Sequence, residues 1–389
     1  MINKKCYIAA AGAGKTTFLV NDIISSHNGA KVGFVTFTVQ NQRNAETKIR
    51  SRFGYLPSNI KILGWYEFLL RYLVNPYKAD IVDCLNTRRI SLIFDEDFSR
   101  VRKAEDGNYY AKYKQGDKVK KYFTKNWEIH KDLLAEFAWE CLKVNKESVA
   151  KRLNESFDAL YLDECQDFGN HDLDILKHIF KTFTGKVYLA TDPRQNIIKT
   201  TKFGNKYSGK IDEFINEKVN LKARTYVELD YDTLSYTHRC IKDICDMATQ
   251  LFEHLPTTEC NCQKCRERRQ GYAGVKGIYV VPESEIKAFL SSGQSMSIVY
   301  SKTEKAPLYG KVLTIGHSKG LEADVVLLYP TKDMLKFFLT NRSIELKDGT
   351  RNKLYVAMTR ARYLLGIVYR DNVKIKNKLL PVWSNNLIS

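Results

Sequence analysis

The stretch that decides the fold of this chain is Cys6-Tyr-Ile-Ala-Ala-Ala-Gly-Ala-Gly-Lys-Thr-Thr-Phe-Leu-Val20. Residues 6–11 form a short apolar run that predicts a buried strand, and residues 15–25 carry apolar side chains at helical spacing. The small residues between them let backbone N–H groups wrap phosphate oxygens at a helix start. Gly14-Lys15-Thr16 is the essential end of a P-loop, so Lys15 is predicted to reach the β- and γ-phosphates of ATP, and Thr16 to bind Mg²⁺. The predicted nucleotide-binding residues of this loop are Ala11, Gly12, Ala13, Gly14, Lys15, Thr16 and Thr17.

An acidic pair after a second apolar run supplies a partner for this loop. The run 159–162 is followed by Asp163 and Glu164. Asp163 is predicted to hold Mg²⁺ through water, and Glu164 to orient and deprotonate the attacking water. Such a pair alone is also typical of an ordinary helix start. Together with the P-loop it predicts ATP hydrolysis.

Strand-like and helix-like runs alternate along the rest of the chain. This alternation predicts an α/β fold with parallel sheets, in which ligands bind at the carboxyl ends of the strands. We predict two such lobes in tandem, the first made of residues 1–80 and 127–224 and the second of residues 225–389. The predicted strands are 6–11, 32–37, 159–162, 187–190, 278–281, 297–300, 312–315, 325–329 and 364–369.

Residues 81–126 interrupt the first lobe and are predicted to form a small inserted basic subdomain. Within it, segment 108–123 has two β-rich runs around Gln115-Gly-Asp117, which predicts a hairpin. Lysines and aromatic residues mix there, so the hairpin either binds DNA phosphates and bases or is a solvated hairpin with cross-strand aromatic pairs. Its candidate DNA-binding residues are Lys118, Lys120 and Lys121.

The composition, with 44% hydrophobic and 12% aromatic residues, is that of an ordinary folded protein. Lysine and arginine number 62 against 44 acidic residues, a formal charge of +18, which predicts a polyanionic partner unless the extra lysines only solubilise the surface. No apolar run approaches the ~18 residues of a membrane span, and the N-terminus lacks a signal-peptide pattern. We therefore predict no membrane association and a cytoplasmic protein, in which most of the nine cysteines are free thiols.

Several blocks of the sequence, taken in order, resemble the motifs of superfamily 1 DNA helicases of the UvrD/Rep type, here in a compact form. The first is the P-loop. The blocks that follow it are Val35-Thr-Phe-Thr38, Asp163-Glu-Cys-Gln-Asp167 (the family's DExQD), Ala190-Thr-Asp-Pro-Arg-Gln195 (GDPxQ), LSYTHRC at 234–240, TIGHSKGLE at 314–322 and LYVAMTRAR at 354–362.

This resemblance implies two RecA-like ATPase lobes that use ATP and Mg²⁺. It implies that Gln195 senses the γ-phosphate, and that Arg239 and Arg360 are arginine fingers. Such fingers stabilise the charge of the transferred phosphate and make hydrolysis depend on closure of the lobes. The further nucleotide contacts that it implies are His238, Gly320 and Glu322, and the weaker candidates for contacts to a DNA strand are Thr36, Thr38 and Thr314.

The ATP-site residues match the family better than the strand-binding blocks do. His238 stands where the family usually has an aromatic residue that stacks on the base, and Gly64-Trp-Tyr-Glu-Phe68 replaces the usual T-x-H-x-F block. The family's large inserted domains are reduced to 81–126 in the first lobe and nearly absent in the second. A chain reduced in this way either translocates on single strands without unwinding well or takes the missing surface from a partner.

A cysteine-rich loop, 254–270, contains Cys260-Asn-Cys-Gln-Lys-Cys265. A CxxC spacing lets two thiolates meet one tetrahedral Zn²⁺, so Cys260, Cys262 and Cys265 are candidate zinc ligands. The fourth ligand is open between His254, Cys245 and Cys240, and the alternative is a polar loop with free thiols.

These observations predict an ATP-dependent translocase or helicase that acts on single-stranded or partly duplex DNA, with 3′-to-5′ polarity implied by the resemblance alone. One alternative is an ATP- or DNA-sensing regulatory subunit that does not unwind DNA. Compact members of this family occur beside nucleases in bacterial anti-phage systems such as Gabija, which implies a nuclease partner. A DNA-binding protein with an inactive ATPase is a third possibility, but the intact Lys15, Glu164 and arginines argue against it.

Overall fold

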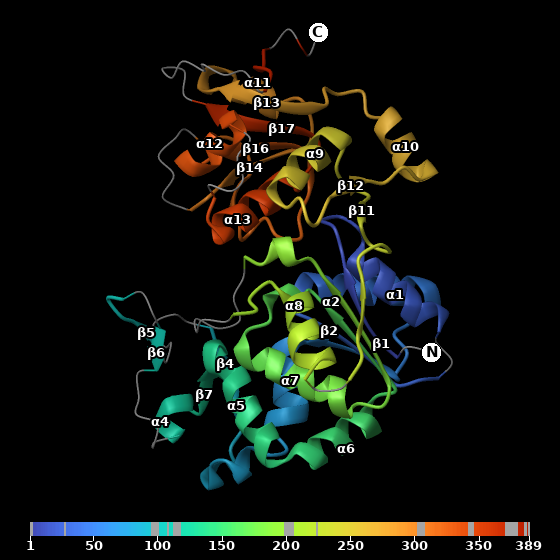
Figure 1. Cartoon of the computed structure of the whole chain (residues 1–389), viewed down its shortest axis with the longest axis vertical. Helices are drawn as coiled ribbons and strands as arrows, with labels where there is room; N and C mark the ends of the chain where they lie inside the picture. The colour runs from blue at the N-terminus through green and yellow to red at the C-terminus, as the bar shows by residue number, and fades with distance from the viewer. Residues whose placement is uncertain are drawn as a thin grey trace. The chain divides into compact units, whose positions relative to one another are not determined.

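A computed structural model describes residues 3–26, 29–94, 101–106, 109–111, 118–197, 206–222, 225–301, 308–340, 346–369, 380–384 and 387 (Figure 1). The chain divides into two compact units. The N-terminal unit comprises Met1–Ile8, Lys15–Pro193 and Ile198–Asp230. The C-terminal unit comprises Ala9–Gly14, Arg194–Ile197 and Tyr231–Ser389.

The N-terminal unit is built around a parallel sheet of six described strands in the order β10-β1-β9-β8-β2-β3. Every residue of β2 and β8 is buried, which explains why these strands read as continuous apolar runs. Because the strands are parallel, the carboxyl ends of β1, β8 and β9 meet at one edge of the sheet. The strands, in spatial order, are β10 (Glu228–Asp230), β1 (Lys4–Ile8), β9 (Lys186–Thr191), β8 (Ala159–Asp163), β2 (Val32–Thr36) and β3 (Ile60–Gly64).

Helices cover this sheet and make its core. Leu19 and Ile23 of α1 and Ile49 of α2 pack with Phe34 and Tyr161 of the sheet. The helices of this unit are α1 (Lys15–Ser25), α2 (Val39–Phe53), α3 (Trp65–Phe68), α4 (Lys118–Tyr122), α5 (Lys131–Val144), α6 (Lys146–Ser156), α7 (Asn170–Thr182) and α8 (Ile211–Phe214). Shorter 3-10 and π turns are η1 (Leu69–Val74), η2 (Lys78–Asp80), η3 (Asp83–Leu85), η5 (Cys165–Asp167) and η7 (Ile215–Asn220), and η6 (Pro193–Gln195) lies where the chain passes between the units.

The C-terminal unit has a parallel sheet of five described strands in the order β13-β17-β16-β14-β15. Successive residues of β16 alternate between two cores, because Val326 and Leu328 join one and Val325 and Leu327 join the other. Both faces of this sheet are therefore covered. The strands are β13 (Gly277–Pro282), β17 (Ala361–Tyr369), β16 (Ala323–Tyr329), β14 (Ser295–Val299) and β15 (Val312–Thr314).

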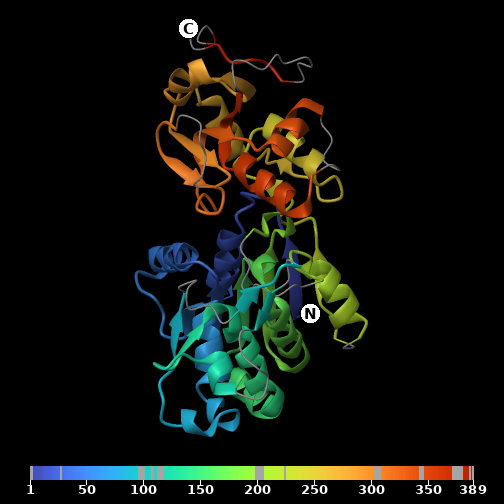
Figure 2. The ribbon, with the colours of Figure 1, turned by 90° about the vertical axis from the view of Figure 1, so that its left-hand side faces the viewer.

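Two groups of helices cover the faces of the C-terminal sheet. Helices α9, α12 and α13 contribute to one core, and α9 and α13 lie side by side in Figure 2. Helix α11 and Trp383 contribute to the other core. The helices are α9 (Lys242–Leu251), α10 (Gln263–Gln270), α11 (Ile286–Leu290), α12 (Lys332–Thr340) and α13 (Asp348–Met358), with a 3-10 turn η8 (Glu283–Glu285).

In the described ranges, three pairs of short strands lie outside the two main sheets. They are β4 (Ser91–Ile93) with β7 (Glu128–His130), β5 (Val101–Lys103) with β6 (Tyr109–Ala111), and β11 (Tyr236–Thr237) with β12 (Thr258–Glu259).

The predicted α/β fold with parallel sheets is confirmed, and the predicted helix 15–25 has the bounds of α1. The first predicted strand, 6–11, ends earlier, at Ile8. The structure also differs at the lobe boundary, because β10 pairs with β1 and keeps residues 225–230 with the first sheet. No helix in the described part of the chain is long and apolar enough to cross a membrane.

The prediction of a hairpin over 108–123 is wrong, because its second run is not a strand. Residues Lys118–Tyr122 form helix α4, and the first run, β6, pairs instead with β5, which precedes it. Tertiary packing explains the difference, because the buried Tyr122 ring lies 5.0 Å from Phe137 of α5. The turn predicted at 115–117 lies outside the described residues.

Candidate functional site

The P-loop residues of α1 face the acidic pair that follows β8, all within the N-terminal unit. The Thr16 hydroxyl donates a 2.5 Å hydrogen bond to Asp163 Oδ2. Lys15 Nζ lies 3.5 Å from Glu164 Oε1, and both side chains are largely buried. Parallel pairing explains the approach, since β1 and β8 both pair with β9 and end at the same edge of the sheet. The four residues predicted to carry phosphate and metal chemistry are thus brought together.

The environment of the acidic pair is unusual for carboxylates. Burial and the neighbouring charge of Glu164 raise the pKa of Asp163 to about 7, although Lys15 and Thr16 oppose the shift. Glu164 has a left-handed backbone, with φ 62° and ψ 37°. Non-glycine residues in this region cost about 1–3 kcal/mol and occur most often at functional sites. The sequence carried no signal for this strain.

The first part of the P-loop packs within the C-terminal unit, against the segment Thr237–Arg239. The backbone N–H of His238 donates to the carbonyl of Gly12 at 3.0 Å. A Cβ at Gly12 would lie 2.6 Å from Arg239 Cβ and 2.7 Å from Thr237 Oγ1. With φ +74°, Gly12 also has a backbone that side chains disfavour. Residue 12 therefore must be glycine for this contact to form.

Two residues that the sequence reasoning missed also hold the P-loop within the C-terminal unit. Arg194 is buried, donates to the carbonyl of Ala9 at 2.7 Å and lies over the ring of Tyr355, 4.9 Å from its centre. The Tyr355 hydroxyl accepts a 3.2 Å hydrogen bond from the backbone N–H of Ala11. Both residues lie inside blocks that the sequence analysis quoted. Arg194 directly precedes Gln195, and Tyr355 lies within LYVAMTRAR, so their neighbours in the sequence were a signal that could have identified them.

The predicted phosphate sensors of the C-terminal unit lie in two polar networks. In the first, the buried Arg360 donates to Gln195 Oε1 at 3.3 Å and to the carbonyl of Leu321 at 3.1 Å. In the second, Arg239 Nε donates to Glu322 at 2.6 Å. Burial opposes the ionisation of Glu322, but Arg239 and Arg362 lower its pKa to about 2. The carboxylate therefore stays charged and holds Arg239 in place.

The donor set fits a magnesium nucleotide. Lys15 supplies a cation, Thr16 and Asp163 supply the oxygen ligands that Mg²⁺ prefers, and the loop from Gly12 to Gly14 has two positive-φ glycines. Gly320 also has positive φ and nothing near its Cβ position, and Thr17 is half-buried in α1.

A comparison with known protein families identifies the family of the chain. The profile of the UvrD-like helicase C-terminal domain matches residues 111–372. The chain belongs to the UvrD-like helicase family. No protein of curated function matches the chain. The matched range includes Asp163, Gln195, Arg239 and Arg360, so the acidic pair and the arginine networks described above are parts of a UvrD-like helicase.

Two of the candidate strand contacts of this UvrD-like helicase lie at the end of β2. The Thr38 hydroxyl caps α2 by accepting from the backbone N–H of Asn41 at 3.1 Å. Thr36 is 1% exposed, and its hydroxyl has no hydrogen-bond partner among the described residues. The Thr36 side chain is therefore not presented to solvent.

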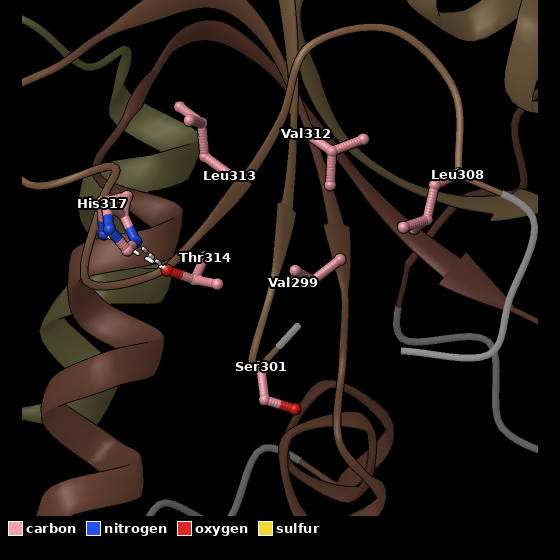
Figure 3. A pocket seen from close by; sticks show the side chains of 7 residues that line it. All are labelled: Val299, Ser301, Leu308, Val312, Leu313, Thr314 and His317. Atoms are coloured by element: carbon pink, nitrogen blue, oxygen red, sulfur yellow. Dashed lines mark hydrogen bonds between the residues drawn. The ribbon is translucent and has the colours of Figure 1, made fainter. Parts of the chain in front are cut away.

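The third candidate, Thr314, lines a pocket of about 310 Å³ in the C-terminal unit (Figure 3). Its hydroxyl lies 2.6 Å from His317 Nδ1, and Figure 3 shows the two side chains turned toward one another at the pocket. The other residues of the wall are mostly apolar, namely Val299, Ser301, Leu308, Val312 and Leu313.

The basic residues of α4 have different surroundings from one another. Lys118 and Lys120 are exposed. Lys121 is less exposed, forms an ion pair with Glu136 of α5 and lies over the ring of Tyr122. The inclusion of Lys121 among the DNA-binding residues is therefore not supported, because its charge is already partnered within the protein.

The candidate zinc ligands converge, together with a histidine that the sequence reasoning had given another role. One ligand atom each from His238, Cys260, Cys262 and Cys265 lies within 4.8 Å of every other. We call these four residues the Cys/His cluster. His238, which the resemblance implied as a nucleotide contact, has its Nδ1 3.4 Å from Cys265 Sγ.

The fourth ligands considered from sequence are not part of the Cys/His cluster. Cys240 and Cys245 are buried, and their thiols are directed at the backbone carbonyls of Thr359 and Cys240, each at 3.8 Å. His254 is exposed, and its ring lies against Phe252.

Proposed function

We propose that this UvrD-like helicase is an ATP-driven translocase that moves 3′ to 5′ along single-stranded DNA. The observation that carries the proposal is the approach of Lys15 and Thr16 to Glu164 and Asp163. A cation, a hydroxyl and two carboxylates at one sheet edge are the groups that phosphoryl transfer to water requires. The family supplies the polarity and the strand substrate as expectations, and the charge of +18 supports a polyanionic partner.

In the proposed reaction, ATP replaces Glu164 as the partner of Lys15. Phosphate oxygens replace the Glu164 carboxylate beside the ammonium group, which frees Glu164 to accept a proton from water. The water oxygen bonds to the γ-phosphorus as the bond to the bridging oxygen breaks, and ADP leaves with that electron pair. Magnesium, held by Thr16 and by Asp163, would neutralise charge on the phosphates.

The arginine networks would make hydrolysis sensitive to the nucleotide state. We assign Arg239 and Arg360 as the groups that stabilise the γ-phosphate in transfer, and Gln195, which accepts from Arg360 at 3.3 Å, as the group that senses the γ-phosphate. Arg239 is held by Glu322 rather than by solvent, so little reorganisation is needed when the phosphate binds. We further assign Thr314 and His317 to the DNA strand, because their polar pair opens onto a pocket with an apolar wall.

Directional motion can be tested with single-stranded oligonucleotides that carry streptavidin at one end. The full chain with ATP should displace streptavidin from the 5′ end much faster than from the 3′ end. Equal displacement from both ends, or faster displacement from the 3′ end, would contradict the assigned polarity. The Glu164→Gln variant should bind the same oligonucleotide and displace nothing, because its base is absent.

A parallel assay separates translocation from unwinding and from signalling. A duplex with a 3′ single-stranded tail is incubated with the protein and ATP, and both ATP turnover and strand displacement are measured. Turnover with displacement indicates a helicase, and turnover with streptavidin release but no duplex displacement indicates a translocase. Turnover without either would favour the regulatory role in a nuclease-containing defence complex over the function proposed here.

A further inference from the structure

The Cys/His cluster has the composition and size of a mononuclear metal site. Three thiols and one imidazole are the ligand set of Cys3His structural zinc centres. Zinc lies about 2.3 Å from sulfur and about 2.0–2.1 Å from nitrogen, so tetrahedral ligand atoms stand about 3.5–3.8 Å apart. The Nδ1 of His238 is already 3.4 Å from Cys265 Sγ, and all four ligand atoms lie within 4.8 Å of one another. Small movements of side chains would complete the tetrahedron.

The backbone explains why residues so far apart in sequence converge. Strands β11 and β12 pair in parallel, which brings the residues that follow them, His238 and Cys260, to the same end. The backbone N–H of Cys260 donates to the carbonyl of Thr237 at 2.9 Å and fixes this register. Cys262 is the N-cap of α10, and the N–H of Cys265 bonds to the carbonyl of Cys262 at 3.0 Å, which closes a CxxC turn.

The element that carries these ligands has almost no apolar core of its own. Helix α10 has the sequence QKCRERRQ, and its one buried residue is Cys265. The strands β11 and β12 have two residues each. Such small elements rarely fold on hydrophobic burial alone and are commonly held by a metal.

The charges around the cluster also suit a bound metal. Three thiolates, one neutral imidazole and one Zn²⁺ leave a net charge of −1, which needs nearby cations. Arg268 donates to the carbonyl of His238, and Arg269 donates to the carbonyl of Cys260 at 2.9 Å. The helix also carries Lys264 and Arg266. Arg268 and Arg269 therefore place positive charge beside the backbone of two ligands, and Arg269 also pairs with Glu259 at 3.3 Å.

One residue of the Cys/His cluster, His238, also belongs to the segment Thr237–Arg239, which packs against the P-loop. His238 lies between Thr237 and Arg239, and its backbone N–H donates to the carbonyl of Gly12 at 3.0 Å. The space that a Cβ on Gly12 would occupy is filled by Thr237 and Arg239. Restraint of the His238 side chain would therefore also restrain the backbone that borders Gly12 and the arginine that pairs with Glu322.

We propose that His238, Cys260, Cys262 and Cys265 bind one structural zinc ion, which anchors the segment Thr237–Arg239 against Gly12. The site itself is independent of the activity of the chain. Its consequence for nucleotide binding rests on the function proposed above. Loss of zinc is expected to release α10 and to weaken ATP binding, while the acidic pair of the N-terminal unit keeps its contacts with Lys15 and Thr16.

Metal content of the purified full chain tests the site directly. Wild type, after dialysis against a weak chelator, should retain one zinc per chain by elemental analysis, and His238→Ala should retain none. Cobalt added to the apoprotein should give the visible absorption of a tetrahedral thiolate site, and this absorption should be lost in Cys262→Ser. His254→Ala and Cys84→Ser are matched controls, since both residues are exposed and lie outside the cluster, and both should keep the metal.

Further variants separate the zinc site from the proposed function. His238→Cys should keep zinc, because it offers a fourth thiolate. His238→Ala should lose zinc. An unchanged zinc content in His238→Ala would show that the His238 side chain is not a ligand. Lys15→Ala should keep full zinc and lose ATP turnover. Wild-type chain that hydrolyses ATP but binds neither zinc nor cobalt would overturn the zinc site alone. Full zinc without any ATP turnover would overturn the proposed function alone.

Discussion

The acidic edge of the N-terminal sheet and the Cys/His cluster of the C-terminal unit hold their functional side chains by different means. Asp163 ends a strand whose five residues are all buried, so the core of the sheet fixes its position. The cluster is carried by two-residue strands and a helix with one buried residue. The first site is positioned by apolar packing before any ligand binds. Under the zinc site proposed above, the second depends on its metal ligands for order.

The difference implies that the two sites respond differently to loss of a single side chain. At the sheet edge, removal of a functional group should abolish chemistry without unfolding, because the surrounding core remains. At the cluster, removal of a ligand should loosen the local fold first and affect chemistry only indirectly.

The largest effect is expected for Lys15→Ala. This variant should lower kcat for ATP hydrolysis by about 100- to 1000-fold or more, the usual cost of losing one preorganised charge donor. Steady-state phosphate release measures the loss, and circular dichroism with zinc content checks that the fold is intact. A variant that unfolds, or that hydrolyses ATP at the wild-type rate, would refute the preorganised sheet edge.

Cys265→Ser is expected to act locally on the second site. Amide exchange in α10 should accelerate by about 100-fold. This factor corresponds to ~2.7 kcal/mol, the stabilisation expected when free zinc is present at about 100 times its Kd. Hydrogen-exchange mass spectrometry would report α10 and α7 in the same sample. Unchanged exchange in α7 is the internal control, since its apolar face belongs to the N-terminal core. Equal exchange of α10 in the variant and in wild type would show that the metal does not order this element.

Gly12→Ala probes the contact that joins the cluster to the P-loop. The added Cβ would meet Arg239 Cβ at 2.6 Å, in a backbone with φ +74°, so KM for ATP should rise by roughly tenfold, or ~1.4 kcal/mol. Gly54→Ala is the matched control, because Gly54 has φ +79° and nothing within 4 Å of its Cβ position. That control should lose stability by about 1 kcal/mol without a change in KM. Similar KM values for both variants would argue against the contact.

The smallest effect is expected on the surface of α4. The double variant Lys118→Glu and Lys120→Glu should weaken binding to single-stranded DNA by about 3- to 10-fold at low salt, and less as salt rises. Fluorescence anisotropy over a salt series measures this. The double variant Lys151→Glu and Lys181→Glu, at exposed positions of α6 and α7, changes the net charge by the same amount and is the control. Unchanged affinity of the double variant at low salt would remove α4 from the DNA site.

Sequence patterns predicted the approach of Lys15 and Thr16 to the acidic pair, because these residues stand at the ends of regular elements. The run 159–162 and the helix 15–25 have strong periodic signals, and the acidic pair and Lys15 follow directly from them. The pairing of Lys121 with Glu136 and the packing of Tyr122 on Phe137 depend on tertiary contacts with α5. No local pattern of residues 108–123 could reveal them, and this is why a hairpin was expected there.

The position of His238 was hidden for a related reason. Its convergence with the cysteines depends on the pairing of β11 with β12, and two-residue strands leave no periodicity to detect. The resemblance to family motifs also drew attention to base stacking at this position. The CxCxxC of 260–265, which begins 22 residues after His238, was the available sign of the proposed Cys3His site. The strained backbone of Glu164 had no sequence signal at all.

The central claim, that a preorganised P-loop and acidic pair hydrolyse ATP in response to a DNA strand, is tested most directly by steady-state turnover. Phosphate release by the full chain should be slow alone, rise severalfold or more with single-stranded DNA, and be abolished by Glu164→Gln, which retains the shape of the side chain without its charge. Wild-type turnover that ignores DNA, or undiminished turnover by Glu164→Gln, would contradict the account.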